Sequence, residues 1–464
     1  MKAVFILSDS FRRDHIGAYG NSWVHTPNLD RLAGMSHVFD RMYTGSFPTG
    51  PNRRDIHVGK GEAPGTPFNS WKHIEPDEVT LAARLGEAGV HTQMITDVAN
   101  GSARGANMWD GFDAYTVNRG QEGDSHFSDD AACLDYPIPR ELIRYREGHL
   151  HKVLMNRARR RREEDYFAPG TFKLACEWLE RNRTREDFLL WLEVFDPHEP
   201  WDPPPWYVDR YDPGYEGRIF EFPPYGYYRK MGITDREMQH TQARYAGEVT
   251  MVDHSVGRLL ATLDRLDLLD ETAIFFTSDH GIYAGHEGDA GCVGKPWLVC
   301  DDTAWLVGGD FTVSNPTYLP LRTGTMRIPL FIRLPGQSDQ VRHEGIVQPW
   351  DLHPTVLEMF GVGRPDDLQG ESLIPALGGG ALPEREYAFN CCLHSGAGTK
   401  QAMNREWIYT CWPDGAREPN LIDLRGDPAQ DRNAAGENPD VCRRMHEALA
   451  AYDSGAFEGT ENPW

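Results

Sequence analysis

MKAVFILSDSF, residues 1–11, opens the chain with a short apolar run that ends in Ser-Asp-Ser. The run AVFIL (3–7) has no polar alternation, which is typical of a strand buried on both faces of a parallel or mixed sheet. Similar runs recur at 188–195, 272–277 and 329–334. The opening stretch lacks the length and the small-residue cleavage site of a signal peptide. We therefore expect it to be the first strand of the mature protein.

Helical patterns lie between these apolar runs. Residues 80–89 have a threonine suited to an N-cap and a closing glycine, and residues 247–263 place their valines and leucines on one stripe. Strands that alternate with helices predict an α/β sandwich with a large mixed, mostly parallel central sheet. The sequence therefore predicts one large α/β domain over residues 1–385.

The pattern changes after about residue 385. We expect residues 386–464 to form a small C-terminal α+β subdomain with antiparallel strands and one helix. The Pro-rich segment 197–217 predicts an irregular rim over the site. The charge run 156–165 favours a solvated helix face with internal ion pairs to Glu163 and Glu164, and an oligomer contact is the second interpretation.

The composition excludes several classes of partner. The net charge of −23 argues against nucleic acid and anionic membrane as main partners. No stretch approaches the ~18 apolar residues of a membrane span. The eight cysteines have no CxxC spacing, so we expect reduced thiols and a cytoplasmic protein. A small anionic substrate would need local arginines and a metal ion to overcome the acidic field.

Ionisable residues stand just beyond three of the predicted strands. Asp9 follows the first strand, His198 follows the strand at 188–195, and Asp279 and His280 follow the strand at 272–277. Ligands bind beyond the carboxyl ends of strands in an open α/β sheet, so we expect these side chains to converge. Carboxylates and an imidazole together suit a divalent metal ion.

The segment Thr49-Gly-Pro-Asn-Arg53 opens a predicted helix, because proline fits the first helical turn. The simplest interpretation of Thr49 is a helix cap or turn residue. The alternative is a nucleophile whose hydroxyl pKa is lowered by a metal ion. Arg53, four residues later, would then lie on the same helical face and hold a substrate oxyanion.

Seven segments in order make the chain resemble a sulfatase of the alkaline phosphatase superfamily from residue 3 to about 450. They are FILSDSFRRDHIGAYG with TPNLDRLA, FDPHEPWDPP, YAGEVTMVDHSVGRLL, FFTSDHG with Gly294-Lys295, MRIPLFIRLPG, WDLHPTVLEMFGV and LQGESLIPAL. The resemblance implies the family's sandwich fold. It also implies metal ligation by Asp9, Asp279 and His280, contact of Arg53 with nucleophile and oxyanion, and substrate or leaving-group contacts by His198 and Lys295.

The chain also departs from the family pattern. The family oxidises a Cys or Ser to formylglycine at the position of Thr49, whereas oxidation of threonine would give a ketone. Ser10 replaces a second metal-binding aspartate and His280 stands where many sulfatases have Asn, as in phosphonate monoester and phosphate diester hydrolases of the group. The family's Lys-x-His segment is replaced by ITDVANG, which leaves Thr96, Asp97 and Asn100 as candidates for its role.

These departures predict a metal-dependent hydrolase of phosphate diesters or phosphonate monoesters with Thr49 as nucleophile. The alternatives are a sulfatase of unusual mechanism and an inactive anion-binding pseudoenzyme. The Asp-x-x-x-His spacing of two-metal relatives is absent after the strand at 188–195, so we expect one metal ion: Mn²⁺, Zn²⁺ or Ca²⁺. The stretch 296–326 is longer than usual and would contact a leaving group or form an arm of a homo-oligomer.

Overall fold

The structure is a computed structural model of the chain that describes residues 1–61, 74–98, 107–128, 130, 147–295, 298–299, 317–394, 397–412 and 417–453. Within these residues the main sheet has nine strands in the order β13-β2-β14-β8-β1-β6-β4-β5, with β15 paired to β2. Its strands are β1 (Lys2–Ser8), β2 (His37–Tyr43), β4 (His91–Thr96), β5 (Ala114–Val117), β6 (Phe188–Val194), β8 (Thr272–Ser278), β13 (Arg327–Ile328), β14 (Leu330–Arg333) and β15 (Val341–Val347).

The centre of the main sheet is parallel, as predicted. Strand β1 pairs in parallel with both β6 and β8, and β4 pairs in parallel with β5 and β6. Strand β14 is antiparallel to both β8 and β2. The predicted α/β fold with a mixed, mostly parallel sheet is confirmed.

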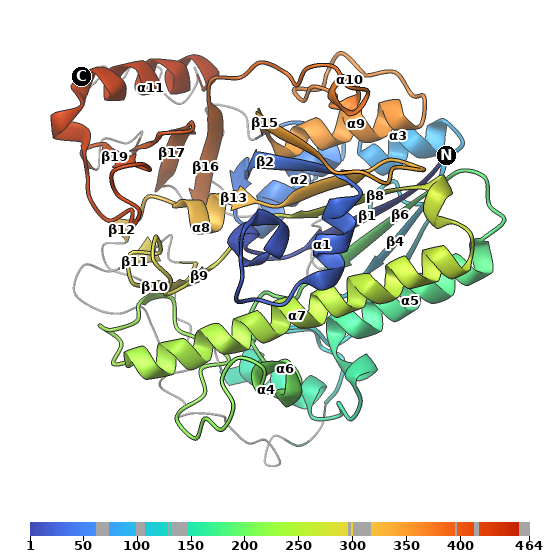
Figure 1. Cartoon of the computed structure of the whole chain (residues 1–464), viewed down its shortest axis with the longest axis horizontal. Helices are drawn as coiled ribbons and strands as arrows, with labels where there is room; N and C mark the ends of the chain where they lie inside the picture. Colours follow the sequence, from blue (N-terminus) through green and yellow to red (C-terminus); the bar gives the residue numbers. More distant parts are fainter. Residues whose placement is uncertain are drawn as a thin grey trace.

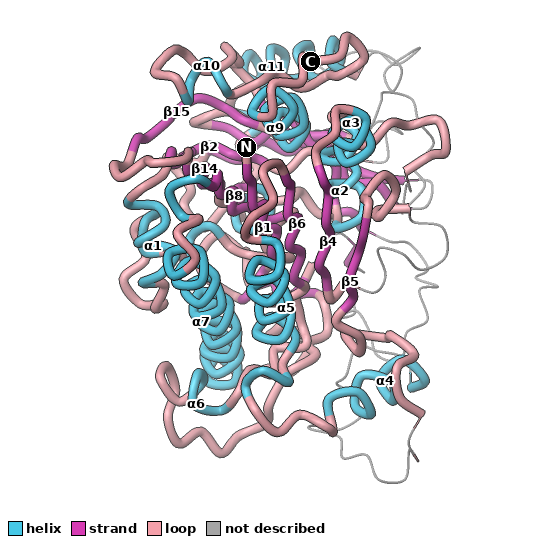
Figure 2. Tube along the Cα trace, turned by 90° about the vertical axis from the view of Figure 1, so that its right-hand side faces the viewer, coloured by secondary structure: helices cyan, strands magenta, loops and turns pink. Residues whose placement is uncertain are grey.

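The apolar runs are buried on both faces because helices cover both sides of the sheet. In β1, Val4 and Ile6 pack into one core with helices α5 (Phe167–Asn182) and α7 (Asp235–Arg265). Phe5 and Leu7 pack into the opposite core with helices α2 (Thr49–Val58), α3 (Leu81–Glu87) and α9 (Leu352–Met359). Figures 1 and 2 show the sheet between these two helical layers. None of the described helices combines the length and apolar character needed to cross a membrane.

Shorter helices and ribbons complete this part of the chain. The helices are α1 (Pro27–Gly34), α4 (Glu147–Arg157), α6 (Pro205–Val208), α8 (Thr323–Met326) and α10 (Ile374–Leu377). The ribbons are β7 (Gly226–Tyr227) with β10 (Cys292–Gly294) and β9 (Tyr283–Ala284), and β11 (Leu298–Val299) with β12 (Thr317–Tyr318). The last pair lies in the 296–326 stretch, most of which is outside the described residues.

A second sheet holds the C-terminal part of the chain. Its order is β19-β18-β17-β16-β3, from β3 (Ser46–Phe47), β16 (Ala388–His394), β17 (Ala397–Met403), β18 (Trp407–Cys411) and β19 (Asn420–Asp423). Strands β16 to β19 are antiparallel neighbours, and helix α11 (Pro439–Tyr452) packs on them. Strand β3 joins in parallel to β16, so the segment before Thr49 belongs to this second sheet. The prediction of a C-terminal subdomain over residues 386–464 did not include that pairing.

Two local predictions need correction. The Pro-rich segment contains a helical turn, α6, because Pro205 fits its first position. The charge run is not mainly paired within itself: Arg157 and Arg160 both bind Asp202, at 3.2 and 2.9 Å, and Arg157 also binds Glu221, at 2.5 Å. These arginines therefore bind the charge run to the segment after β6, whereas a solvated helix face was predicted.

Candidate active site

The candidate site lies at the carboxyl ends of β1, β6 and β8. These strands are parallel neighbours in register, so the residues that follow them emerge at one edge of the sheet. Asp9, Asp279 and His280 are fully buried there, and one ligand atom of each lies within 4.8 Å of the others. The structure thus brings together three residues that lie up to 271 positions apart, as the strand-end argument predicts.

The orientation of His280 suits a metal ligand. Its Nδ1 lies 2.8 Å from the carbonyl oxygen of Gly281, so Nδ1–H donates there and the Nε2 lone pair faces the carboxylates. Nε2 lies 3.5 Å from Asp279 Oδ2 and 4.0 Å from Asp9 Oδ1. Burial lowers the pKa of His280 despite the neighbouring Asp279 carboxylate. The imidazole is therefore neutral, which is the form that binds a cation.

The two carboxylates are held by hydrogen bonds through Oδ1, and their Oδ2 atoms lie beside the Arg53 guanidinium. Asp279 Oδ1 accepts from the backbone amides of Ser10, at 3.0 Å, and His280, at 2.7 Å. Ser10 Oγ donates to Asp9 Oδ1 at 2.7 Å. Asp9 Oδ2 is buried without a hydrogen-bond donor, although Arg53 Nη2 lies 3.1 Å away. A buried carboxylate oxygen without a donor, next to a second carboxylate and an imidazole, fits a divalent cation.

Thr49 is the first residue of α2 and its side chain points into this cluster. Thr49 Oγ1 lies 3.0 Å from His280 Nε2. The N-cap residue of α2 is Pro48, and no side chain caps the helix. The capping interpretation of Thr49 is therefore wrong, because its hydroxyl faces His280 rather than a helix amide.

Arg53 lies one turn after Thr49 and faces three buried carboxylates. Its guanidinium contacts Glu193 through Nε, Asp279 through Nη1 and Asp9 through Nη2. Burial would lower the pKa of Arg53, but the charges of these three carboxylates raise it, so the guanidinium stays charged. Its Nη1 also lies 3.4 Å from the Thr49 carbonyl oxygen. Arg53 thus positions the carboxylates and the helix start, and its contact with a substrate oxyanion stays a prediction.

Lys295 also borders the cluster. Its Nζ is 3.5 Å from His280 Nε2 and 3.9 Å from Asp9 Oδ1, and the residue is buried. Burial would raise the pKa of Asp279, but its interactions with His280, Arg53 and Lys295 outweigh that effect and lower the pKa overall. Two fixed cations, Arg53 and Lys295, therefore flank a cluster of acids in a strongly acidic chain.

His198 follows β6, and a series of packed residues connects it to Lys295. Its ring stacks on Phe195, and its Nδ1 lies 2.6 Å from the Glu199 carbonyl oxygen, which accepts its hydrogen bond, and 3.3 Å from Glu199 Oε2. The Glu199 carboxylate accepts a hydrogen bond from the Tyr225 hydroxyl. The Tyr225 ring covers the backbone of Gly294, where an added methyl group would lie 1.9 Å from Cδ1 of the ring. This series of contacts links the segment of His198 to Gly294, the residue before Lys295.

Several residues of the site were missed in the sequence. Glu193 is an acid within the apolar run at 188–195, a signal that was available because a buried carboxylate requires a partner. Asn52 Nδ2 donates to the Asp279 carbonyl oxygen and thereby joins α2 to the end of β8. Glu199 and Tyr225 carry no spacing that could have indicated their contact.

The candidates for the missing Lys-x-His segment are not placed in the cluster. Thr96 Oγ1 accepts from the amide of Val98 at 2.9 Å. Asp97 accepts from the amide of Phe195 at 2.7 Å and from the hydroxyl of Thr171 at 2.9 Å, so it joins β4, β6 and α5. Asn100 lies outside the described residues. For Thr96 and Asp97 these bonds indicate a structural role.

Comparison with known proteins gives a consistent family. Residues 2–362 match the family model Sulfatase, and residues 321–454 match the model of the C-terminal region of N-sulphoglucosamine sulphohydrolase. An arylsulfatase of Clostridium perfringens is 24% identical over 92% of this chain and 88% of its own. An N-acetylglucosamine-6-O-sulfatase of Bacteroides thetaiotaomicron is 25% identical over 81% of this chain and 70% of its own.

Solved structures show the same fold. The phosphonate monoester hydrolase of Agrobacterium radiobacter superposes with a TM-score of 0.74 at 18% identity, covering 98% of this chain and 96% of that one. The phosphonate monoester hydrolase of Silicibacter pomeroyi gives a TM-score of 0.72 at 20% identity, covering 99% and 96%. Sulfatase-family enzymes bind a divalent metal ion, and Asp9, Asp279 and His280 offer such a site here. The chain belongs to the sulfatase family and is a sulfatase-fold hydrolase.

Proposed function

We propose that this chain is a metal-dependent hydrolase of phosphate diesters or phosphonate monoesters that uses Thr49 as its nucleophile. The observation that carries the proposal is the position of Thr49 Oγ1, 3.0 Å from His280 Nε2 and inside the carboxylate cluster. A hydroxyl placed there is shielded from bulk water, since Thr49 is 9% exposed. Such a position serves attack on an ester better than it serves a surface turn.

The side chain of Thr49 favours phosphorus over sulfur as the reaction centre. Formylglycine needs a primary Cβ that can be oxidised to an aldehyde, and the Cβ of threonine carries a methyl group. A sulfated threonine has no aldehyde hydrate through which to expel sulfate. A phosphorylated threonine is resolved when water attacks phosphorus and the Thr49 oxygen leaves. The methyl group also restricts χ1 and so helps hold Oγ1 toward His280.

Asp9, Asp279 and His280 would hold the metal ion, with Thr49 Oγ1 beside them. When bound, a divalent ion supplies Lewis-acid polarisation and lowers the pKa of a nearby hydroxyl. A carboxylate pair with one imidazole suits Mn²⁺ and Zn²⁺, and Ca²⁺ accepts the oxygen ligands. Arg53 keeps Asp9 and Asp279 in place while it neutralises part of their charge.

The remaining residues have roles that follow from their positions. The Thr49 oxygen forms a bond to phosphorus while the bond to the leaving oxygen breaks, and Lys295 stabilises the charge of the phosphoryl oxygens. His198 donates a proton to the leaving oxygen, which departs as an alcohol or phenol. Thr49 releases its proton to solvent water in the first step. In the second step water attacks phosphorus and gives a proton to His198, which had protonated the leaving oxygen, and Thr49 takes up a proton from solvent as it leaves.

Sulfate-ester hydrolysis is the second candidate, and the curated relatives favour it. The arylsulfatase and N-acetylglucosamine-6-O-sulfatase matches cover most of this chain. Such an activity would require a mechanism without an aldehyde. Comparable turnover of an aryl sulfate and an aryl phosphodiester would favour this candidate over the phosphoesterase.

The test measures hydrolysis of three esters by enzyme loaded with Mn²⁺, Zn²⁺ or Ca²⁺. The esters are bis(4-nitrophenyl) phosphate, 4-nitrophenyl phenylphosphonate and 4-nitrophenyl sulfate. We expect turnover of the phosphorus esters and a covalent adduct on Thr49 in intact-protein mass spectrometry. Thr49→Ala should lower kcat by ~10³-fold or more, while Thr49→Ser should keep the hydroxyl and part of the activity. Metal-loaded enzyme that hydrolyses none of the esters would identify an anion-binding pseudoenzyme. Full activity of Thr49→Ala would exclude the threonine mechanism.

A further inference from the structure

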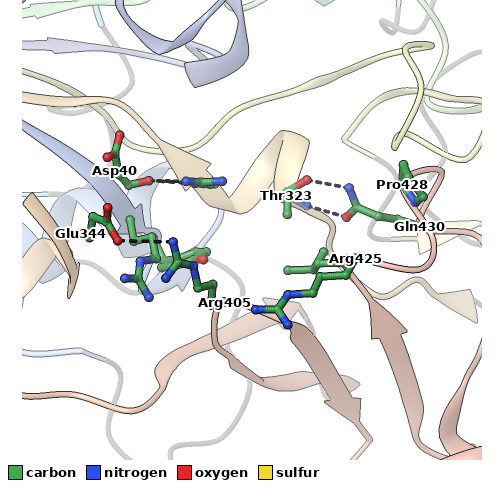
Figure 3. Close-up of a pocket in the computed structure, with 11 residues that line it drawn as sticks. Asp40, Thr323, Glu344, Arg405, Arg425, Pro428 and Gln430 are labelled. Carbon is green, nitrogen blue, oxygen red and sulfur yellow. Dashed lines mark hydrogen bonds and ion pairs between the residues drawn. The ribbon is translucent and has the colours of Figure 1, made fainter.

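A second polar cavity lies between the main sheet and the C-terminal sheet. It has a volume of about 450 Å³ and is shown in Figure 3. Its main-sheet wall comes from β2, β13 and β15, and its other wall comes from the segments before β18 and after β19. Six of its lining residues are charged: Arg41, Arg327, Arg405, Arg425, Asp40 and Glu344. None of the residues of the Thr49 cluster lines it.

Both acids of the cavity already have arginine partners, and those of Asp40 lie outside the cavity. The Asp40 carboxylate accepts from Arg13 at 3.2 Å and from Arg342 at 3.0 Å, and neither arginine lines the cavity. Glu344 pairs with Arg405 at 3.3 Å. Within the described part of the chain, the Arg41 side chain makes no hydrogen bond or ion pair, although its backbone is paired in β2. The cavity therefore has an excess of positive charge although the whole chain carries −23.

Arg327 adds a positive charge in a fixed orientation. Its Nε and Nη2 both donate to the backbone carbonyl oxygen of Asp40, at 2.8 and 2.6 Å. A carbonyl oxygen carries no formal charge, so the charge of Arg327 is oriented but not neutralised. Burial and the nearby Arg327 lower the pKa of Arg13 to about 10, which is consistent with crowded positive charge on this side of β2.

Arg405 and Arg425 can turn toward a ligand at little cost. Figure 3 shows both side chains reaching into the cavity from the C-terminal sheet. Arg405 is 63% exposed and its partner Glu344 is 65% exposed. Arg425 is 66% exposed and pairs with Glu406 at 2.7 Å. Exposed pairs of this kind contribute only ~0–1 kcal/mol, so an incoming anion can displace them.

Two neutral lining residues, Thr323 and Gln430, are held in a fixed orientation. Gln430 Nε2 donates to Thr323 Oγ1 at 2.7 Å, and Gln430 Oε1 accepts from the Thr323 amide at 3.1 Å. The pair of bonds holds the loop after β19 against helix α8. The cavity is thus lined by arginines from both walls, and the fixed pair of Thr323 and Gln430 lies beside them.

We propose that this cavity is a binding site for a doubly charged oxyanion: free sulfate, free phosphate or the phosphate monoester of a small organic group. Arginine presents a planar array of donors that matches oxyanions and favours them over halide, and several arginines together favour a doubly charged anion over a singly charged carboxylate. The volume leaves room for a small organic group beside the anion. The inference is independent of the proposed function, because it uses none of the residues of the Thr49 cluster.

The cavity and the Thr49 cluster lie on either side of α8. Thr323 lines the cavity, whereas the next residue, Gly324, lies against Gly281, where an added methyl group would be 2.0 Å from the Gly324 carbonyl oxygen. The Gly281 amide donates to the Thr325 carbonyl oxygen at 2.8 Å. Because Gly281 follows His280, a binding experiment must separate the two sites.

The experiment is a calorimetric titration of the full metal-loaded chain with inorganic sulfate, inorganic phosphate and methyl phosphate, at ionic strength matched with chloride. The double variant Arg41→Gln/Arg405→Gln removes two cavity charges. The control double variant Arg181→Gln/Arg265→Gln removes two exposed charges outside the cavity: Arg181 on α5 pairs with Glu177, and Arg265 on α7 pairs with Glu180. We expect the cavity variant to lose ~10-fold or more in affinity for one class of sites, and the control variant to bind as the wild type does. Arg41→Gln alone should give a smaller loss, and it removes no bond of the folded state.

Lys295→Ala separates the two sites, since it changes the Thr49 cluster and leaves the cavity intact. The proposal requires this variant to keep the binding that the cavity variant loses. Equal affinities for phosphate and methyl phosphate would assign the cavity to an anion carried by an organic group, and binding of the inorganic ions alone would assign it to a free ion. Identical isotherms for wild type and cavity variant, or binding that only Lys295→Ala abolishes, would overturn the proposal.

Discussion

Arg53 and Glu193 form a buried ion pair that joins the start of helix α2 to strand β6. The same guanidinium contacts Asp9 and Asp279, so Glu193 takes a share of the positive charge that would otherwise fall on the two metal-ligand candidates. Burial raises the pKa of Glu193 although Arg53 lowers it. Glu193 is thus a positioning residue that acts through Arg53.

We predict that Glu193→Gln weakens metal binding. The amide keeps the shape of the side chain but loses its charge, so Arg53 would bind Asp9 and Asp279 more strongly and compete with the cation. We expect the Kd for Mn²⁺ to rise ~10- to 100-fold, as for other residues behind metal ligands. Equilibrium dialysis of chelator-treated protein measures it. Glu180→Gln, at an exposed pair with Arg265, is the control. An unchanged Kd would contradict the role of Glu193.

Tyr225→Phe tests the contact that orients His198. The variant removes the hydrogen bond from Tyr225 to Glu199 and keeps the ring against Gly294. If His198 protonates the leaving group, kcat should fall ~10-fold for alkyl esters with poor leaving groups and little for nitrophenyl esters. Tyr228→Phe removes a comparable bond to Asp235 away from the site and serves as the control. An equal loss for both ester classes would indicate a structural effect.

Gly294→Ala should disturb the contact between Tyr225 and the backbone of Gly294. Gly294 has a φ of +80°, and the added methyl group would overlap the Tyr225 ring. We expect a loss of about 1–3 kcal/mol in the free energy of unfolding, measured in urea, together with lower activity from displaced Lys295. Gly291→Ala has a similar φ of +72° but no atom within 4 Å, so it isolates the backbone strain. Equal losses in both variants would exclude the contact with Tyr225.

Asp253 gives a pH dependence far from the site. Burial raises its pKa to about 7 from the ordinary 3.8, although the amides of Leu29 and Asn28 donate to it. Between about pH 4 and pH 7 the unfolded chain loses a proton that the folded chain keeps. The free energy of unfolding therefore falls as pH rises through this window, by at most ~1.4 kcal/mol per unit.

Asp253→Asn should remove this contribution. The difference in unfolding free energy between wild type and variant should slope from about pH 4 to pH 7 and become flat above it. Chemical denaturation at a series of pH values measures that difference. Asp264→Asn, at an exposed position of the same helix, is the control. A flat difference across the window would show that Asp253 is ionised in the folded state.

The sequence predicted the central sheet and the metal-ligand candidates for a physical reason. Runs without polar alternation can only be buried on both faces, and ionisable residues directly after them must emerge at one edge. Asp9, Asp279 and His280 obey that rule, and Thr49 reaches them because α2 begins beside β8. The metal ion itself, its identity and the ester that is cleaved stay predictions.

Other features could not be found from local patterns. Glu199 meets Tyr225 through side chains from two irregular segments, and no spacing encodes that contact. The cavity arginines come from four separate segments, each ordinary by itself. Asp97 was predicted as a site residue but has a structural role. It follows a strand as Asp9 does, but its carboxylate accepts from the amide of Phe195 and is buried beside the site.

The pairing of β3 with β16 has a consequence for how the enzyme matures during synthesis. Ser46 and Phe47 align with Cys391 and Cys392, and Asn390 Nδ2 donates to Thr44 Oγ1 and the Gly45 carbonyl oxygen at 2.9 and 2.7 Å. The segment before Thr49 is therefore held in place by residues that follow it in the sequence by about 340 positions. A nascent chain still short of β16 lacks this support, so the position of the Thr49 hydroxyl is fixed only after β16 has been synthesised.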